Sequence, residues 1–244
     1  MLIKNNYYFK LLKSFFTKKS VVFNEFKDYF NNEIGLEIGG PSKIFEVDGL
    51  VPVYPLASRI DNCNFSKKTI WQNNILFSSK GKQFILEATN LLEIENESYD
   101  FVLSSDCIEH ISNPLKAINE WLRILKKEGV LLMVVPHKGF TFDHKRSVTK
   151  FSHLLKDYEN DIDEKDLTHL PEILELHDLE KDILAGTFES FKERSKNNYQ
   201  NRCLHHHVFD EKLVIEMFNY LNVKILNIEF QSPYYIIALV QKTV

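Results

Sequence analysis

The feature that most constrains the fold lies in residues 34–42 (IGLEIGGPS), where a short, mostly apolar segment is followed by two consecutive glycines. Such a segment is typical of a buried β-strand. Glycines directly after a strand let the backbone turn tightly and approach a ligand where a Cβ atom would collide. Glu37 lies two residues before Gly39, and its carboxylate disfavours a phosphate. The segment therefore predicts either an ordinary turn or a site for a ligand that carries hydroxyl or ammonium groups.

Strand-like and helix-like segments alternate from this point to residue 136. A less regular stretch over 50–65 contains a second strand that ends near Asp61, and further strands are predicted over 84–90, 99–105 and 130–135. Apolar residues at helical spacing predict a helix over 114–127. The strand 130–135 is apolar almost throughout, which is typical of a strand covered on both faces. The alternation predicts a doubly wound, mostly parallel α/β sheet.

Residues 137–204 interrupt this alternation. They contain no segment typical of a buried strand, and helices are predicted over 148–158, 167–176 and 187–195. A helix over 211–222 and strands over 224–230 and 234–240 are expected to follow. The sequence thus predicts four parts: an N-terminal helical segment (1–33), a cofactor-binding core (34–136), a helical cap for the substrate (137–204), and a C-terminal helix and strand pair that complete the core (205–244).

Composition excludes several classes of protein. The 244 residues are 44% hydrophobic, enough for one large domain. The net charge of −4, without a Lys/Arg block, argues against nucleic-acid binding. Three cysteines without a CxxC pair are expected of a reduced, cytoplasmic protein, and no apolar run approaches the ~20 residues of a transmembrane helix. Residues 1–20, rich in lysine, predict an amphipathic helix that either packs on the domain or contacts an anionic membrane surface.

Five motifs in order resemble the class I S-adenosylmethionine-dependent methyltransferases. They are residues 36–40 (LEIGG), 87–89 (EAT), 99–110 (YDFVLSSDCIEH), 123–129 (RILKKEG) and the strand that ends at Pro136. The resemblance implies a Rossmann-like sheet of seven strands, the last two forming an antiparallel hairpin, with a helical insertion after the fifth strand. Residues 39–42 (GGPS), 143–146 (DHKR) and 201–207 (NRCLHHH) resemble a bacterial subgroup that we associate with capsule and O-antigen sugar modification.

The resemblance also implies which residues bind the cofactor, S-adenosyl-L-methionine: Glu37, Gly39, Gly40, Asp61, Glu87, Ala88, Thr89, Ser105 and Asp106. The first three would hold the methionine end, Asp61 the ribose hydroxyls and residues 87–89 the adenine edge, while the last two would border the sulfonium. Asp61 lies 22 residues after Gly39, near the usual offset of about 20 residues for a ribose-binding acid. Glu46 and Asp48 are alternatives for this role.

The chemistry of methyl transfer to oxygen directs attention to the histidines. The acceptor must lose a proton as it attacks, and imidazole is the side chain best matched to neutral pH. His144 follows the strand that ends at Pro136 and is the candidate general base. Asp143 would point the opposite way in an extended segment, so it is expected to bind a metal or to hydrogen-bond a ligand residue, and not to orient His144. His205 and His207 would face one way in an extended segment and line the same site. A divalent metal bound by these histidines is an alternative, although their spacing matches no recognised zinc pattern.

The activity expected from the sequence is O-methylation of a small acceptor in surface polysaccharide biosynthesis. The acceptor would be a sugar, a nucleotide sugar or a phosphorylated metabolite, and Arg146, Arg194 and Arg202 could clamp its phosphate or carboxylate. Two alternatives use the same fold: an NAD-dependent oxidoreductase and a non-catalytic protein that binds the cofactor. The oxidoreductases typically show G-x-G-x-x-G running into a helix, a pattern that Pro41 and Ser42 interrupt here.

Overall fold

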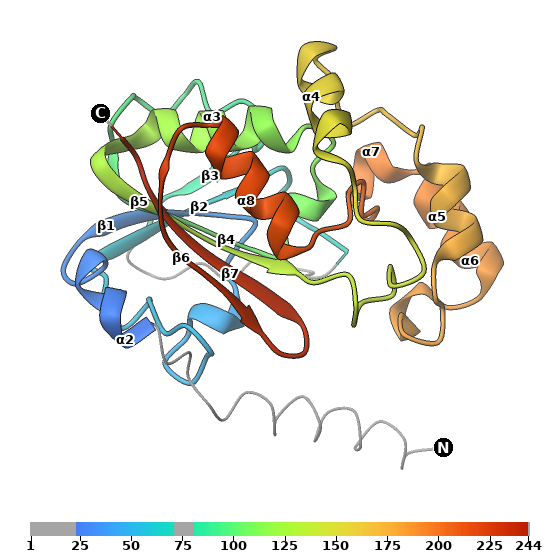
Figure 1. Ribbon diagram of the computed structural model, residues 1–244, viewed down its shortest axis with the longest axis horizontal. Helices are drawn as coiled ribbons and strands as arrows, with labels where there is room; N and C mark the ends of the chain where they lie inside the picture. The colour runs from blue at the N-terminus through green and yellow to red at the C-terminus, as the bar shows by residue number, and fades with distance from the viewer. Residues whose placement is uncertain (1–22, 71–80, 244) are drawn as a thin grey trace.

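A seven-stranded sheet forms the centre of the computed structural model, which describes residues 23–70 and 81–243 (Figure 1). The strand order is β3-β2-β1-β4-β5-β7-β6. The strands are β1 (Ile34–Ile38), β2 (Arg59–Asn64), β3 (Gln83–Ile85), β4 (Tyr99–Ser105), β5 (Leu125–Pro136), β6 (Lys224–Gln231) and β7 (Tyr235–Gln241). The strands β1 to β5 are parallel, whereas β7 pairs antiparallel with both β5 and β6. The predicted mostly parallel sheet with a terminal hairpin is confirmed.

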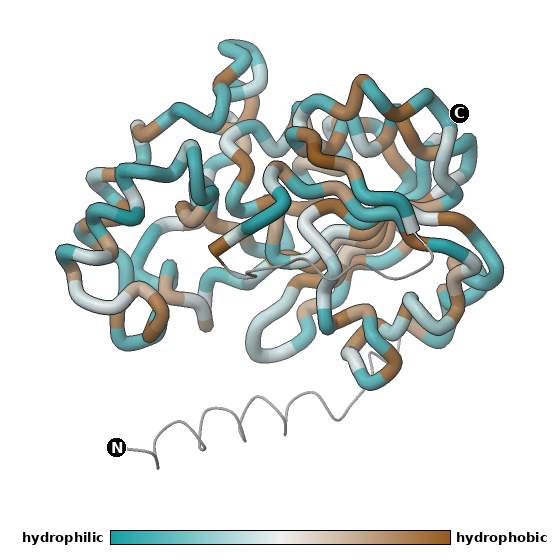
Figure 2. Tube along the Cα trace, turned by 180° about the vertical axis from the view of Figure 1, so that it is seen from behind, coloured by the Kyte–Doolittle hydropathy of each residue, from teal (hydrophilic) through white to brown (hydrophobic). Residues whose placement is uncertain are grey.

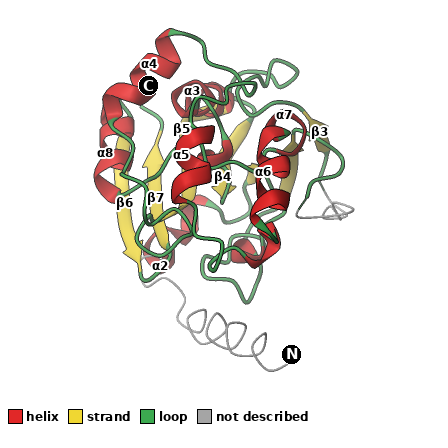
Figure 3. Cartoon of the chain, turned by 90° about the vertical axis from the view of Figure 1, so that its right-hand side faces the viewer, coloured by secondary structure: helices red, strands yellow, loops and turns green. Residues whose placement is uncertain are grey.

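Helices cover both faces of this sheet. The α-helices are α2 (Phe23–Phe26), α3 (Pro114–Ile124), α4 (Phe151–Glu159), α5 (Leu170–Leu176), α6 (Phe188–Lys196), α7 (Asn198–Asn201) and α8 (Glu211–Tyr220). Short 3-10 helices are η1 (Lys27–Tyr29), η2 (Lys43–Phe45), η3 (Ile108–His110) and η4 (Ile183–Ala185). Helices α3 and α8 pack on one face and α2 on the other, while α5, α6 and α7 lie beyond one end of the sheet (Figures 1 and 3). The helical insertion expected after the fifth strand is thus present.

The N-terminal prediction lies largely outside this description. Of the helix expected near the N-terminus, the structure describes α2 and η1, and the amphipathic segment 1–20 with its expected membrane or domain contact falls outside the described residues. Among the helices that the structure does describe, none has the length and apolar character needed to cross a membrane.

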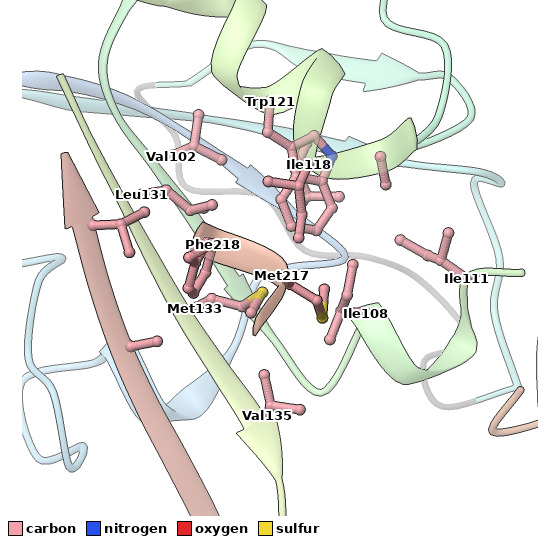
Figure 4. Close-up of a cluster of buried hydrophobic side chains, with 14 of the residues drawn as sticks. Val102, Ile108, Ile111, Ile118, Trp121, Leu131, Met133, Val135, Met217 and Phe218 are labelled. Atoms are coloured by element: carbon pink, nitrogen blue, oxygen red, sulfur yellow. The ribbon is translucent and has the colours of Figure 1, made fainter. Parts of the chain in front are cut away.

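The hydrophobic core has two parts, one on each face of the sheet. Trp121 of α3 and Phe218 of α8 are fully buried against the strands in the first part (Figure 4). Phe30 and Phe45 are buried in the second part, where the Phe30 and Phe101 rings pack edge to face with centroids 5.2 Å apart. Burial of each large apolar side chain contributes about 1.5–3 kcal/mol. Hydrophobic residues are found in the central strands and also along the helices that cover them (Figure 2).

Helix α3 ends earlier than predicted, and its hydrogen bonds explain the difference. It starts as predicted, because the Asn113 side chain accepts a hydrogen bond from the Lys116 amide at 3.1 Å. It ends at Ile124 and not at residue 127, because the carbonyls of Arg123 and Ile124 accept hydrogen bonds from the backbone amides of residues 97 and 98. The next residue, Leu125, already pairs with β4. Strand β5 is therefore five residues longer at its start than predicted.

The strand order places a topological switch point between β1 and β4. From β1 the chain builds outward to β2 and β3, and then returns to the other side of β1 with β4 and β5. In open α/β sheets the crevice at such a point, at the carboxyl ends of the strands, is where ligands bind. The two glycines singled out in the sequence lie at this place, directly after β1.

Candidate functional site

A cavity of about 320 Å³ lies at the carboxyl ends of β1, β2 and β4, a volume within the range of small-molecule sites. Four loops after strands line it, with residues 38–43, 63–65 with Thr69, 86–88, and 105–107 with His110 and Ile111. Glu164 and Arg202, which belong to the region between β5 and α8, complete the lining. The predicted residues Gly39, Gly40, Glu87, Ala88, Ser105 and Asp106 come together here, whereas the lining does not include Glu37, Asp61 or Thr89.

The glycine turn after β1 has two separate steric requirements. Gly39 has φ +85°, a left-handed conformation that L side chains rarely adopt, and a Cβ atom there would lie 2.9 Å from the Cys107 sulfur. A Cβ atom at Gly40 would overlap the carboxyl group of Glu37. Glycine at position 39 therefore permits the turn, and glycine at position 40 leaves room for the Glu37 carboxyl group; both residues form part of one wall of the cavity.

Glu37 lies directly behind this wall. Its side chain is fully buried, and Oε2 accepts a hydrogen bond of 2.5 Å from the Tyr54 hydroxyl. Oε1 is buried without a hydrogen-bond partner among the described residues. Burial raises the pKa of Glu37 to about 7. An orphaned carboxylate oxygen beside exposed glycine backbone is suited to a ligand that brings an ammonium or hydroxyl donor.

Asp61 is a correction to the sequence prediction, because the structure does not bring it to the cavity. Its buried carboxylate accepts hydrogen bonds from the Tyr99 hydroxyl (2.9 Å) and the Lys82 amide (2.7 Å), and it lies 3.2 Å from the Arg59 guanidinium. Strand β2 continues for three residues beyond Asp61, so the residue at its carboxyl end is Asn64. Asn64 lines the cavity and donates to the Gly40 carbonyl at 2.5 Å.

Arg202 lies between two carboxylates of the lining. Its guanidinium is 2.6 Å from Glu87 Oε1 and 3.1 Å from Glu164 Oε2. The other two arginines proposed as phosphate clamps are also paired: Arg146 with Asp143 at 3.1 Å and Arg194 with an aspartate of the insertion at 3.1 Å. The lining also holds Asp106 and Lys43, so three carboxylates stand against two cationic side chains. The cavity is therefore suited to cationic or neutral ligands.

The loop after β4 supplies Ser105, Asp106 and His110. The Ser105 hydroxyl donates to Asp106 Oδ2 at 2.9 Å, and burial raises the pKa of Asp106. His110 Nδ1 lies 3.0 Å from the Leu204 carbonyl oxygen. Because a carbonyl can only accept, Nδ1 carries the proton, and the neutral ring then has its lone pair at Nε2. Burial also lowers the pKa of His110 well below its usual value, which keeps the ring neutral at pH 7.

His110 is the functional candidate that the sequence reasoning missed. A signal was available, because His110 ends the motif 99–110 and follows directly after β4. Its tautomer could not be predicted, since Leu204 is 94 residues away in the chain. The sequence had suggested His144, His205 and His207 as catalytic residues, and none of the three lines the cavity.

The four predicted catalytic residues do not form one site. His144 Nε2 is 2.7 Å from Asp178 Oδ2 and is partly exposed. His205 Nδ1 is hydrogen-bonded to Asp143 Oδ2, and its ring packs edge-on against His110 with centroids 4.6 Å apart. His207 Nε2 lies 3.1 Å from the Ser112 carbonyl and is part of a different cluster. The expectation that His205 and His207 line the same site is therefore corrected: the two rings contact different partners.

A group of three ligand-type side chains adjoins the cavity. Glu109, His110 and His205 have nitrogen or oxygen atoms within 4.8 Å of one another, as a divalent ion would require. His205 Nε2 and His110 Nε2 are each 4.0 Å from Glu109 Oε1, and burial raises the pKa of Glu109 well above its usual value. This group differs from the one suggested by the sequence, which combined His205 and His207 with Asp143 or His144.

Comparisons with known proteins complete the description. Residues 50–133 match the family model of a methyltransferase domain. The comparison with curated proteins found no match. A solved S-adenosylmethionine-dependent methyltransferase from Methanosarcina mazei is 14% identical, with 90% of this chain and 97% of that chain covered and a TM-score of 0.51. Another, from Mesorhizobium loti, is 10% identical, with 90% and 95% covered and a TM-score of 0.53. At these identities the two structures show a shared Rossmann-like fold.

Proposed function

We propose that this chain is an S-adenosylmethionine-dependent methyltransferase whose acceptor is a hydroxyl group of a small, neutral, carbohydrate-type molecule. The observation that carries the proposal is a neutral histidine, His110, in a cavity whose lining has more carboxylates than cationic side chains. The matched methyltransferase domain favours methyl transfer over the NAD-dependent oxidation considered above. A role in capsule or O-antigen biosynthesis rests on the resemblance of the sequence motifs and is part of the proposal.

The residues present fit the cofactor. The methionine end would lie along Gly39 and Gly40 with its ammonium directed at Glu37, whose buried Oε1 is without a partner in the described structure. Asn64 would bind the ribose hydroxyls in place of Asp61, and Glu87 with Ala88 would border the adenine. When bound, the cofactor supplies an electrophilic methyl group on a cationic sulfur. Ser105 and Asp106 would face that charge, and the carboxylates of the lining would stabilise a cation without any phosphate-binding group.

His110 would act as the general base. A hydroxyl loses its proton at neutral pH only with help, and His110 holds a lone pair at Nε2 because Nδ1 donates to Leu204. Asp143 would act as a positioning residue, since its hydrogen bond fixes the His205 ring that packs against His110. His144, the base suggested by the sequence, is instead engaged with Asp178.

The segment after β5 would select the acceptor. Glu164 and Arg202 come from this part of the chain and stand opposite the strand-end loops. Because Arg202 is already paired with Glu87 and Glu164, a phosphorylated acceptor would have to break those ion pairs. A neutral sugar can use the same carboxylates as hydrogen-bond acceptors for its hydroxyls. This reasoning favours the carbohydrate over the phosphorylated metabolite among the acceptors that the sequence suggested.

Methyl transfer from labelled cofactor to a panel of acceptors tests the proposal. The panel combines neutral mono- and oligosaccharides, nucleotide sugars, sugar phosphates and small amines. We expect label on a sugar hydroxyl, with no gain in kcat/KM from a phosphate on the methylated sugar. Label on nitrogen, or turnover of sugar phosphates alone, would contradict the proposed acceptor while leaving the methyltransferase activity intact.

Cofactor affinity should depend on pH through Glu37. Because its pKa is about 7, the carboxylate is mostly protonated at pH 6 and mostly ionised at pH 8. Only the ionised form attracts a cationic ligand, so affinity should rise by up to about 10-fold over this range. Calorimetry at several pH values checks this, and Glu37→Gln should bind more weakly at pH 8 and lose the Glu37-dependent part of the rise. An unchanged pH profile in Glu37→Gln would separate this carboxylate from the cofactor.

A further inference from the structure

Four ligand-type side chains outside the cavity gather where three segments of the chain meet. They are His153 and Asp157, one turn apart on α4, His169 directly before α5, and His207 in the segment between α7 and α8. None of them lines the cavity. Figure 1 shows these segments beside one end of the sheet, where the insertion meets the core.

Three separations in this cluster are close to those between the ligands of a tetrahedral metal centre. His153 Nε2 lies 2.9 Å from His169 Nε2 and 3.4 Å from Asp157 Oδ2, and His207 Nε2 lies 3.6 Å from the same oxygen. All four ligand atoms fall within 4.8 Å of one another. Zinc bonds of about 2.0–2.1 Å at tetrahedral angles place neighbouring ligand atoms about 3.3–3.4 Å apart. The observed separations lie on both sides of that value.

The hydrogen bonding of the cluster leaves one carboxylate oxygen without a proton donor. Asp157 Oδ2 is buried and has no hydrogen-bond partner in the described part of the chain, although it faces two imidazole nitrogens. Neutral imidazole and ionised carboxylate are the forms that bind a metal. His207 Nε2 now donates to the Ser112 carbonyl, and a metal bond would replace that interaction.

We infer that His153, Asp157, His169 and His207 bind one zinc ion with a structural role. Three imidazoles and one carboxylate are ligands that suit zinc, and four protein ligands leave no open position for a substrate. His207 is fully buried, whereas the His153 side chain is 37% exposed and gives the ion a route from solvent. This zinc site is distinct from the group of Glu109, His110 and His205, which adjoins the cavity.

Such an ion would fasten the insertion to the core. His207 precedes Phe209, which is buried in the core and forms a bridge with His137 at the end of β5. Arg202 and Leu204, which contact cavity residues, lie in the same segment. Removal of zinc should therefore loosen α4 and α5 against this segment while the glycine turn after β1 keeps its shape.

Metal analysis of the purified protein tests the inference. We expect one zinc per chain by mass spectrometry, release by a chelator, and a melting temperature about 5 °C or more lower without the metal. His153→Ala and His169→Ala should lose the metal. His144→Ala is the matched control, because it also removes a histidine of the insertion paired with an aspartate, and it should retain zinc. Cobalt in place of zinc should give the strong visible absorption of four-coordinate cobalt.

Several results would overturn the assignment. Wild-type protein that binds no zinc after titration, or whose melting temperature a chelator leaves unchanged, would do so without any substitution. Zinc retained by both His153→Ala and His169→Ala would also contradict it. Loss of zinc in His205→Ala, with retention in His153→Ala, would place the ion at the Glu109, His110 and His205 group instead. These readouts do not involve methyl transfer, so they stand or fall independently of the proposed acceptor.

Discussion

Replacement of Gly39 by alanine should weaken S-adenosylmethionine binding by about 10²-fold or more, equivalent to about 2.7 kcal/mol. Two costs add in this variant. The backbone at φ +85° is strained for any L side chain, and the new Cβ atom meets the Cys107 sulfur at 2.9 Å. To relieve the strained φ angle or the contact with Cys107, the backbone at this wall of the cavity would have to move. Calorimetric titration with the cofactor and with S-adenosylhomocysteine measures the effect.

Gly186→Ala is the matched control for this experiment. Gly186 also has positive φ, +74°, but a Cβ atom there would lie 3.7 Å from its nearest neighbour, and the residue is not among those that line the cavity. The variant carries a backbone penalty in the insertion, at φ +74° and ψ −133°, so we expect a loss of stability with unchanged cofactor affinity. Equal binding by Gly39→Ala and the wild type would show that the cofactor does not use the glycine turn.

His110→Gln should lower kcat by roughly 10²–10⁴ and change cofactor affinity by less than about 3-fold. The glutamine side chain can still donate to the Leu204 carbonyl, as His110 does at 3.0 Å, but it cannot accept a proton. The wild-type kcat should stay level as the pH falls from 8 to about 6.5. Burial lowers the pKa of His110, so the basic form persists until the pH falls below that lowered value. Steady-state kinetics over this range, with the acceptor found in the panel, provides the measurement.

His144→Gln serves as the comparison for the base. This residue was the candidate from the sequence, and its pairing with Asp178 predicts near-normal turnover in the variant. The opposite pattern, a large loss in His144→Gln with His110→Gln unaffected, would return the role of general base to His144. A similar loss in both variants would also count against His110 as the sole base.

The parts of the fold that follow from local pattern could be predicted from the sequence. Strand β4 has the predicted bounds, and β1 lies within the predicted segment 34–42, because short apolar runs flanked by turn residues are a local signal of a strand. The end of α3 could not be predicted, because it depends on hydrogen bonds from residues 97 and 98, about 26 positions earlier in the chain. Boundaries set by such contacts leave no periodic signal in the helix itself.

The site divides in the same way. The positions of Gly39, Gly40, Ser105 and Asp106 at the cavity could be predicted, because these residues lie at or directly after the ends of strands. The carboxyl ends of parallel strands meet at one edge of a sheet. Asp61 was misplaced because counting residues from Gly39 does not reveal how far β2 extends. The partners of Arg202 and His207 are about 38 to 115 residues away, so neither the ion pairs nor the zinc-type cluster could be read from spacing.

A crystal structure with S-adenosylhomocysteine bound would test the central claim most directly. We expect the methionine end against Gly39 and Gly40 with its ammonium near Glu37, the ribose hydroxyls at Asn64, and the sulfur facing Asp106 and His110. A ligand bound at Asp61, or at a surface away from the carboxyl ends of β1 and β4, would contradict the account.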